Sequence, residues 1–355
     1  MSKLRIGAIG CGYWGPNLIR NFIEIPEADL VAISDLQQDQ LDRITTRYPQ
    51  IEVATQNYRD FYDLELDGVV IATPPHTHYK IAMECMEHGL HAQIEKPITL
   101  NSDDAEKLTK AFVEKGLVLM VGHTFEYNPA VRLLKKMIDQ GELGEIHYID
   151  AVRASLGLFQ TRANVLWDLA PHDISILRHI LGADPISVSA TGSDCVQEGI
   201  EDVAYGRLNF PNKISAHIRT SWLDPLKTRR ITVVGSKKMV IYDDVEPHDK
   251  IKIYDKGVTA IRRTETFGEF HFAYHYGDVI SPYIRFEEPL RLQCQHFLEC
   301  IQDGKTPLTD GRNGTQVVKI LEAMQHSMEN NGKQVALEQE KYSQNGLVHK
   351  ELVMA

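Results

Sequence analysis

The sequence predicts a two-domain protein of the α/β class, with a doubly wound parallel sheet first and a mainly antiparallel α+β domain after it. Three observations predict this architecture. The chain has 355 residues, which is more than one hydrophobic core ordinarily organises. Short apolar runs alternate with helical stretches up to about residue 122. Beyond that point, runs of strands follow one another with few helices between them.

Composition and charge exclude several classes of protein. Apolar residues make up 43% and charged residues 25% of the chain, the balance of a globular protein. The net charge of −11 argues against nucleic acid or a membrane surface as a partner, since phosphate binding needs a basic surface. No apolar run approaches the ~20 residues that span a bilayer, and a strand at Leu4–Ile9 leaves no room for a signal peptide. Five scattered cysteines without a CxxC pair indicate reduced thiols, so we expect a cytoplasmic protein.

The first part of the chain has the pattern of a parallel sheet covered by helices on both faces. The predicted strands are Leu4–Ile9, Leu30–Ser34, Gly68–Ala72, His91–Ile94 and Val118–Val121. The predicted helices are Pro16–Ile25, Gln40–Tyr48, Tyr79–Gly89 and Ser102–Lys115. This alternation defines an expected first domain over residues 1–122.

The second part, over residues 123–355, is built differently. Its predicted strands are 186–194, 202–210, 214–223, 229–237, 239–244 and 250–255, and its predicted helices are Pro129–Gly141, Asn164–Leu181, Pro289–Asp303 and Gly314–Asn331. In the third of these strands, Ala216, Ile218 and Trp222 alternate with polar residues such as His217 and Arg219. Period-two alternation indicates an antiparallel sheet with one face on a core.

A glycine-rich loop follows the first predicted strand and opens the first predicted helix. Gly10–Cys11–Gly12–Tyr13–Trp14–Gly15 has the pattern G-x-G-x-x-G, which is weak evidence unless strand and helix flank it, as they do here. Gly10 permits a tight turn, Gly12 lets the backbone approach a pyrophosphate, and Gly15 allows close packing of helix on sheet. The helix N-terminus then offers backbone N–H donors to the phosphates. The loop therefore predicts a bound dinucleotide.

Asp35 indicates which dinucleotide is bound. It lies at the end of the second predicted strand, 20 residues after Gly15, where a carboxylate accepts hydrogen bonds from the ribose hydroxyls. The same carboxylate repels the 2′-phosphate of NADP, and no arginine stands next to it in Leu36–Gln38. The sequence therefore favours NAD as the cofactor.

Three further segments complete a recognisable pattern. Ala72–His78 reads A-T-P-P-H-T-H at the end of a strand, Glu95–Lys96–Pro97 follows the next strand, and Asp168–Asp173 lies in the second half. Together with the glycine loop, these segments resemble the glucose–fructose oxidoreductase / inositol dehydrogenase (Gfo/Idh/MocA) family. The resemblance spans nearly the whole chain, and the Glu-Lys-Pro after an A-T-P-x-x-x-H loop is its most specific element.

The resemblance implies a Rossmann domain followed by an α+β domain with a large open, mostly antiparallel sheet, through which members form homodimers or homotetramers. It implies oxidation or reduction of a carbinol carbon of a sugar, cyclitol or nucleotide-linked sugar. Lys96 matches the catalytic lysine, and Asp168 and His172 match the Asp-x-x-x-His pair. The expected cofactor contacts, from the loop and the resemblance, are Gly10, Gly12, Tyr13, Trp14, Gly15, Asp35, Thr73, Pro74, His78, Glu95 and Lys96.

The expected chemistry needs these residue types. Oxidation of an alcohol by NAD requires hydride transfer and loss of the hydroxyl proton, and the second event requires a nearby base. Lys96 serves if burial and the positively charged nicotinamide lower its proton affinity, while the imidazole of His172 already titrates near neutrality. Asp168, four residues earlier on the same helix face, can orient that imidazole. Which of the two bases contacts the substrate oxygen stays open.

The substrate contacts are predicted from position. Tyr127 and Asn128 join the two domains, and Arg153 and Arg162 precede the Asp/His pair, where a guanidinium can anchor a phosphate or carboxylate. Asn164 opens the segment that carries the pair. No metal site is expected, since no third ligand with metal-site spacing follows His76 and His78.

Two classes of function compete. The favoured hypothesis is an NAD-dependent dehydrogenase or reductase of a sugar derivative. The form Trp167–His172 resembles members from amino-sugar and nucleotide-sugar pathways. The bulky Trp167 departs from the small residues that many members of the family carry before the Asp, so the substrate does not follow from the best-known members. Inositol or another free polyol is the alternative substrate. A non-catalytic NAD-binding regulatory protein is the rival class, and the joint presence of Lys96, Asp168 and His172 argues against it.

Overall fold

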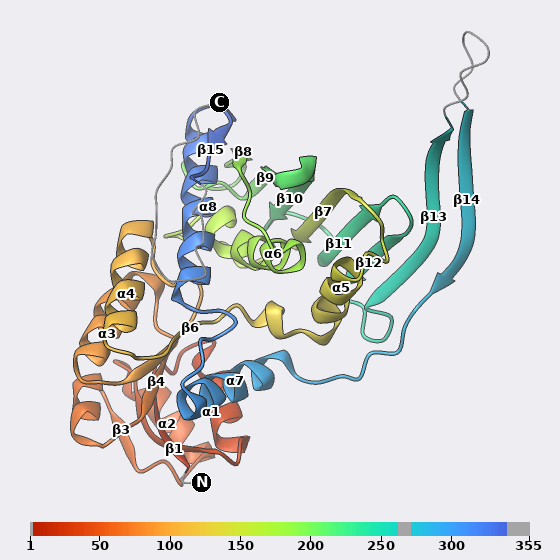
Figure 1. Ribbon diagram of the computed structural model, residues 1–355. Coiled ribbons are helices and arrows are strands. Elements are labelled where there is room, and N and C mark those ends of the chain that lie inside the picture. Colours follow the sequence, from red (N-terminus) through yellow and green to blue (C-terminus); the bar gives the residue numbers. More distant parts are fainter. Residues whose placement is uncertain (1–2, 262–270, 339–355) are drawn as a thin grey trace. The chain divides into compact units, whose positions relative to one another are not determined.

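The computed structural model describes residues 3–261 and 271–338 (Figure 1). These residues form two compact units. Unit 1 comprises the described residues up to Asn128 together with Phe286–Lys319, and unit 2 comprises those of Pro129–Arg285 and those from Ile320 onward. The chain therefore enters unit 1 twice.

The sheet of unit 1 is parallel and doubly wound. Over the described residues its strands lie in the order β3-β2-β1-β4-β5-β6, and every pairing between them is parallel. They are β1 (Leu4–Ile9), β2 (Ala28–Ser34), β3 (Val53–Thr55), β4 (Gly68–Ile71), β5 (His91–Ile94) and β6 (Leu119–Val121). The order reverses between β1 and β4, and ligands of such sheets bind beyond the carboxyl ends of the strands at this reversal. The predicted parallel sheet is confirmed, and β3 is an addition to it.

The helices of unit 1 lie close to the predicted segments. They are α1 (Gly15–Glu24), α2 (Gln38–Arg47), α3 (Pro75–Glu87) and α4 (Ser102–Glu114), with the 3-10 turns η1 (Tyr58–Asp63) and η2 (Thr124–Tyr127). α7 (Pro289–Asp303), from the later part of the chain, packs against α1 through the rings of Phe22 and Phe297, whose centroids are 6.4 Å apart. Buried Leu290, Cys294 and Leu298 extend the contact, so the late segment completes the core of unit 1.

The sheet of unit 2 is mostly antiparallel, as predicted. Over the described residues its strand order is β14-β13-β12-β11-β7-β10-β9-β8-β15, and β7 pairs in parallel with β10. The strands are β7 (Ile146–Ala154), β8 (Ser187–Ser193), β9 (Val203–Asn209), β10 (Ser215–Ser221), β11 (Thr228–Gly235), β12 (Met239–Asp243), β13 (Ile251–Ile261), β14 (His271–Ile280) and β15 (Val335–Ala336). Strands β7, β14 and β15 are additions to the predicted set.

Helices of unit 2 pack on this sheet. α6 (Val165–Leu181) lies against β7, β9 and β10, and α5 (Pro129–Asp139) lies against α6 and β12. The long helix α8 (Gly311–Glu329) runs through the boundary at Lys319, and η3 (Pro211–Lys213) connects β9 to β10. The buried face of β10 carries Ala216, Ile218 and Thr220, which confirms the predicted alternation. Within the described ranges, no helix is both long enough and apolar enough to cross a membrane.

Candidate active site

The glycine loop of unit 1 has the geometry of a dinucleotide cradle. Gly10 has a φ of +99°, and a Cβ there would lie 2.7 Å from the backbone of Ala72. A Cβ on Gly15 would lie 1.9 Å from the carbonyl oxygen of Gly10, so only glycine lets α1 begin so close to the loop. A Cβ on Gly12 would meet no atom of the described residues within 4 Å. The loop thus exposes an open backbone edge at the start of α1, which fits a pyrophosphate.

Asp35 holds this loop from the end of β2. Its Oδ2 accepts a hydrogen bond from the backbone N–H of Cys11 at 2.7 Å, and its Oδ1 accepts one from Gln37 at 2.9 Å. Arg43 on α2 also contacts the loop, because its Nη2 donates to the carbonyl oxygens of Cys11 at 3.1 Å and Gly12 at 3.4 Å. Sequence reasoning missed Arg43, which stands outside the motif. Tyr13 and Trp14, at the tip of the loop, are 89% and 38% exposed.

The loop after β4 is tied to the Glu-Lys-Pro segment by His78. This side chain is fully buried, with Nδ1 2.9 Å from the carbonyl oxygen of Pro97 and Nε2 2.8 Å from that of Thr73. Burial lowers the pKa of His78, against the opposing effect of its hydrogen bonds to the backbone of Pro97 and Thr73. Both ring nitrogens contact backbone, and His78 therefore positions the two loops. Pro74 precedes the first turn of α3, and the hydroxyls of Thr73 and Thr77 are 2.7 Å apart.

Glu95 and Lys96 stand directly after β5. The Nε1 of Trp14 donates a hydrogen bond to Oε1 of Glu95 at 3.0 Å, which ties the glycine loop to this segment. Burial raises the pKa of Glu95 to about 7, against the opposing effects of the neighbouring Lys96 and of the Trp14 indole. A Cβ on Gly122 would lie 2.8 Å from Oε1 of Glu95, so a glycine after β6 makes room for the carboxylate. Unit 1 thus gathers the predicted cofactor residues at the carboxyl ends of its strands.

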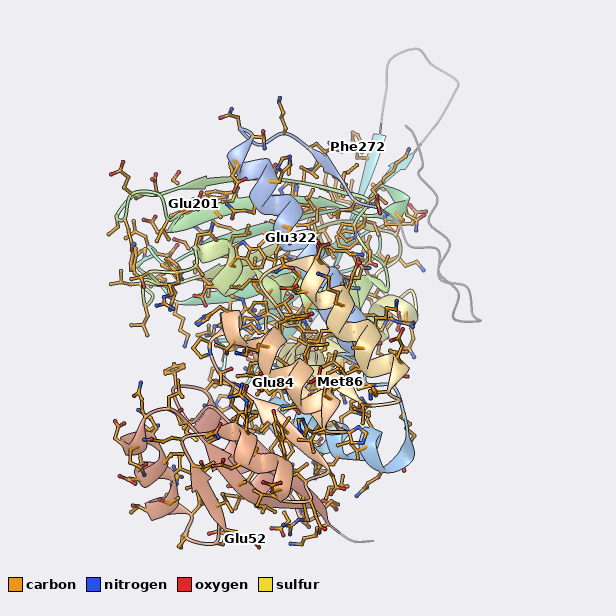
Figure 2. The ribbon with its side chains drawn as sticks, turned by 90° about the vertical axis from the view of Figure 1, so that its left-hand side faces the viewer. Glu52, Glu84, Met86, Glu201, Phe272 and Glu322 are labelled. Atoms are coloured by element: carbon orange, nitrogen blue, oxygen red, sulfur yellow. The ribbon has the colours of Figure 1, made fainter. Side chains whose placement is uncertain are left out.

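Helix α6 carries the acid and the histidine of unit 2. It begins after Asn164, whose Oδ1 accepts a hydrogen bond from the N–H of Trp167 at 3.2 Å. The Nδ2 of Asn164 donates to Glu201, labelled in Figure 2, at 2.7 Å and to Gln325 at 2.9 Å. Asn164 therefore caps the helix with its whole amide group engaged.

Asp168 and His172 lie one helical turn apart on α6, and both side chains are partly exposed. The Nε1 of Trp222 donates a hydrogen bond to Oδ2 of Asp168 at 2.9 Å. Pro171 lies between them inside the helix and lacks the N–H that would bond to the carbonyl of Trp167. The alternation along 214–223 places Trp222 on the same face as Ala216 and Ile218, but its contact with Asp168 has no local sequence signal.

Arg153 lies beneath the helix. Its Nε and Nη2 each donate to the carboxylate of Asp173 at 2.9 Å, and the two side chains are 6% and 2% exposed. This buried two-bond pair fastens α6 to β7 and engages the guanidinium, which favours a structural role over a substrate contact. Arg162, in contrast, is exposed on the loop before α6.

Tyr127 and Asn128 lie in the interior of unit 1. Tyr127 is fully buried, and its hydroxyl lies 3.2 Å from Oγ1 of Thr309. Asn128 is 5% exposed. Core packing therefore accounts for Tyr127, one of the predicted substrate contacts. Among the described residues, no group of three or more His, Cys, Asp or Glu side chains could hold a metal ion.

Comparison with known proteins decides the family. Residues 4–123 match the oxidoreductase family with an NAD-binding Rossmann fold, and residues 135–337 match the C-terminal alpha/beta domain of the same family. The chain belongs to the Gfo/Idh/MocA oxidoreductase family. The NAD-binding Rossmann fold predicted from the glycine loop and Asp35 is thereby confirmed.

Named relatives of this Gfo/Idh/MocA protein act on sugars and polyols. The scyllo-inositol 2-dehydrogenase (NAD(+)) of Bacillus subtilis is 24% identical over 92% of this chain and 95% of its own length. The UDP-N-acetylglucosamine 3-dehydrogenase of Acidithiobacillus ferrooxidans is 26% identical over 74% of this chain and 80% of its own length. The solved structure of that enzyme has the same fold, with a TM-score of 0.76 at 24% identity over 93% of this chain and 99% of the other.

Proposed function

We propose that this Gfo/Idh/MocA oxidoreductase interconverts a ring CH–OH and the corresponding ketone of a sugar derivative, and that the substrate is an amino-sugar or nucleotide-sugar. One observation carries the proposal. The Trp14–Glu95 hydrogen bond ties the Glu-Lys-Pro segment to the glycine loop, so Lys96 stands at the edge of the sheet where the dinucleotide binds. The relationship to the UDP-N-acetylglucosamine 3-dehydrogenase supports the substrate class.

NAD+, when bound, supplies the hydride acceptor. The residues of the chain supply the rest: Gly12 and the start of α1 hold the pyrophosphate, Asp35 holds the ribose, and Lys96 and His172 share the transfer of the hydroxyl proton. Asp168 stabilises the imidazolium of His172 once the imidazole has accepted that proton.

A free polyol such as an inositol is the second candidate substrate. The inositol dehydrogenases of Bacillus subtilis and Thermotoga maritima are each 24% identical over 92% of this chain, a longer match than that of the UDP-N-acetylglucosamine enzyme. The Trp167–His172 segment favours the nucleotide-sugar, because its form resembles members from amino-sugar and nucleotide-sugar pathways.

The test is an assay of NADH formation by the purified protein with UDP-N-acetylglucosamine, scyllo-inositol and myo-inositol. We expect the nucleotide-sugar to give the highest kcat/KM. Lys96→Ala should lower kcat by about a thousandfold or more while NAD binding persists. Lys80→Ala, which removes an exposed lysine on α3, is the matched control. Tight NAD binding without turnover on any of the three substrates would favour the regulatory alternative.

We also propose that the chain forms a homodimer or homotetramer through the sheet of unit 2. The support comes from β14, which carries Phe272, Tyr274 and Tyr276 on one face with exposures of 56%, 63% and 74% (Figure 2 labels Phe272). Such a two-stranded aromatic ribbon is marginally stable in water unless something covers it.

Light scattering tests this interface. The double variant Tyr274→Ser/Tyr276→Ser should give a smaller mass than wild type, whereas Tyr283→Ser, which changes a residue after the strand, should leave the mass unchanged. An equal mass for all three proteins would contradict this interface.

A further inference from the structure

We propose that Trp222 is a positioning residue of the active site: its indole N–H fixes the carboxylate of Asp168, and thereby the partner of His172. The inference rests on the proposed role of Asp168 in proton transfer. Trp222 follows β10 directly and is 2% exposed, and its Nε1 lies 2.9 Å from Oδ2 of Asp168. A hydrogen bond between a buried indole N–H and a carboxylate is charge-assisted and fixes the rotation of the carboxylate.

The indole is itself held rigidly. The backbone N–H of Trp222 donates a hydrogen bond to the backbone carbonyl of Asp202 at 2.9 Å. The backbone carbonyl of Trp222 accepts one from the backbone N–H of Gly157 at 2.8 Å. A Cβ on Gly157 would lie 3.0 Å from Cδ1 of the indole, so this glycine lets the loop before α6 cross the ring closely. The ring of Phe159 packs on the indole with a centroid distance of 5.6 Å. The donor therefore reaches Asp168 from a fixed position on the sheet.

Helix α6 needs such an external hold at this turn. Pro171 has no backbone N–H to donate to the carbonyl of Trp167, so the helix lacks one of its own hydrogen bonds at the turn that carries Asp168. The Asn164 cap secures the helix before this turn, and the Arg153–Asp173 pair secures it after. The Trp222 contact acts on the interrupted turn itself.

A double-mutant cycle tests this role with the substrate that gives turnover. We expect Trp222→Phe, which keeps an aromatic ring and removes the N–H, to lower kcat by about tenfold with little change in the Kd of NAD. In an Asp168→Ala background the same substitution should cost less than about twofold, because the carboxylate it positions is gone. Phe159→Leu trims the packing on the indole and keeps the N–H, and should change kcat by less than about threefold. Equal losses from Trp222→Phe in both backgrounds would overturn the proposal.

A second measurement needs no turnover and no Trp222 variant. The chain has three tryptophans, so the ¹⁵N-labelled protein gives three indole N–H resonances in NMR spectra. Trp14→Phe and Trp167→Phe assign them. Asp168→Ala should move the Trp222 resonance upfield and speed its exchange with D₂O, while the Trp14 resonance stays in place. A Trp222 resonance that Asp168→Ala leaves unchanged would overturn the proposal. If no tested sugar is oxidised, the proposed function fails and the resonance still decides whether the indole holds Asp168.

Discussion

Replacing Glu95 by glutamine removes a carboxyl group whose pKa is raised by burial from its usual 4.5 to about 7. Between these two values the native protein holds a proton that the unfolded chain has released. The unfolded chain binds fewer protons there, so the free energy of unfolding falls as the pH rises. The full loss is about 3 kcal/mol once the pH exceeds 7, of which about 2.5 kcal/mol is expected between pH 5 and pH 8. The glutamine side chain carries no charge at any pH, and its carbonyl oxygen can still accept the hydrogen bond of Trp14.

Urea unfolding of the NAD-depleted protein, followed by circular dichroism at pH 5, 6, 7 and 8, measures the difference in unfolding free energy between Glu95→Gln and wild type. We expect the unfolding free energy of Glu95→Gln, relative to that of wild type, to rise by about 2.5 kcal/mol between pH 5 and pH 8. Glu87→Gln, at an exposed position of α3, is the control and should give a difference that does not follow pH. A flat difference for Glu95→Gln, or one that moves in the opposite direction, would refute the reasoning.

Three further predictions concern the two units. Asp35→Asn should weaken NAD binding by about tenfold and narrow the preference over NADP in calorimetric titrations, whereas an unchanged NAD/NADP ratio would contradict the role of the carboxylate. Arg153→Met leaves the carboxylate of Asp173 buried without its partner and should lower the free energy of unfolding by about 3–5 kcal/mol, with part of this loss recovered by Asp173→Asn. Gly15→Ala should lower both the melting temperature and NAD affinity, because its Cβ would lie 1.9 Å from a carbonyl oxygen. Gly12→Ala should lower NAD affinity with little change in melting temperature, and equal melting behaviour of the two variants would count against this geometry.

The strands that local patterns predict are those with a continuous apolar face. β7 lacks one, because its buried positions include Ala151 and Arg153. A buried arginine looks like a break in the alternation until its partner, Asp173 on α6, is known. On β14 the described side chains are exposed on both faces, so no period-two pattern of burial exists to be read. The short β3 has three residues, too few for any periodicity.

The motifs name candidate site residues, but they do not indicate most of the contacts that those residues make. The spacing of Asp35 from the glycine loop reflects a local geometry: Asp35 follows β2, next to β1, and its carboxylate accepts a hydrogen bond from the backbone N–H of Cys11 in the loop after β1. The two indole–carboxylate bonds join residues 81 and 54 positions apart, Trp14 with Glu95 and Trp222 with Asp168. Pairings of this kind depend on the tertiary fold, so the sequence without homologues carries no signal for them.

The return of the chain to unit 1 at Phe286 sets an order for folding during synthesis. The contact of Phe297 with Phe22 joins residues far apart in the chain, so α1 waits for its partner helix while most of unit 2 is being made. At typical rates of translation this delay is on the order of ten seconds or more. During that time the apolar face that α7 later covers, including Phe22, is available to chaperones. A fragment that stops after residue 122 retains the glycine loop but never receives α7, and we expect it to aggregate.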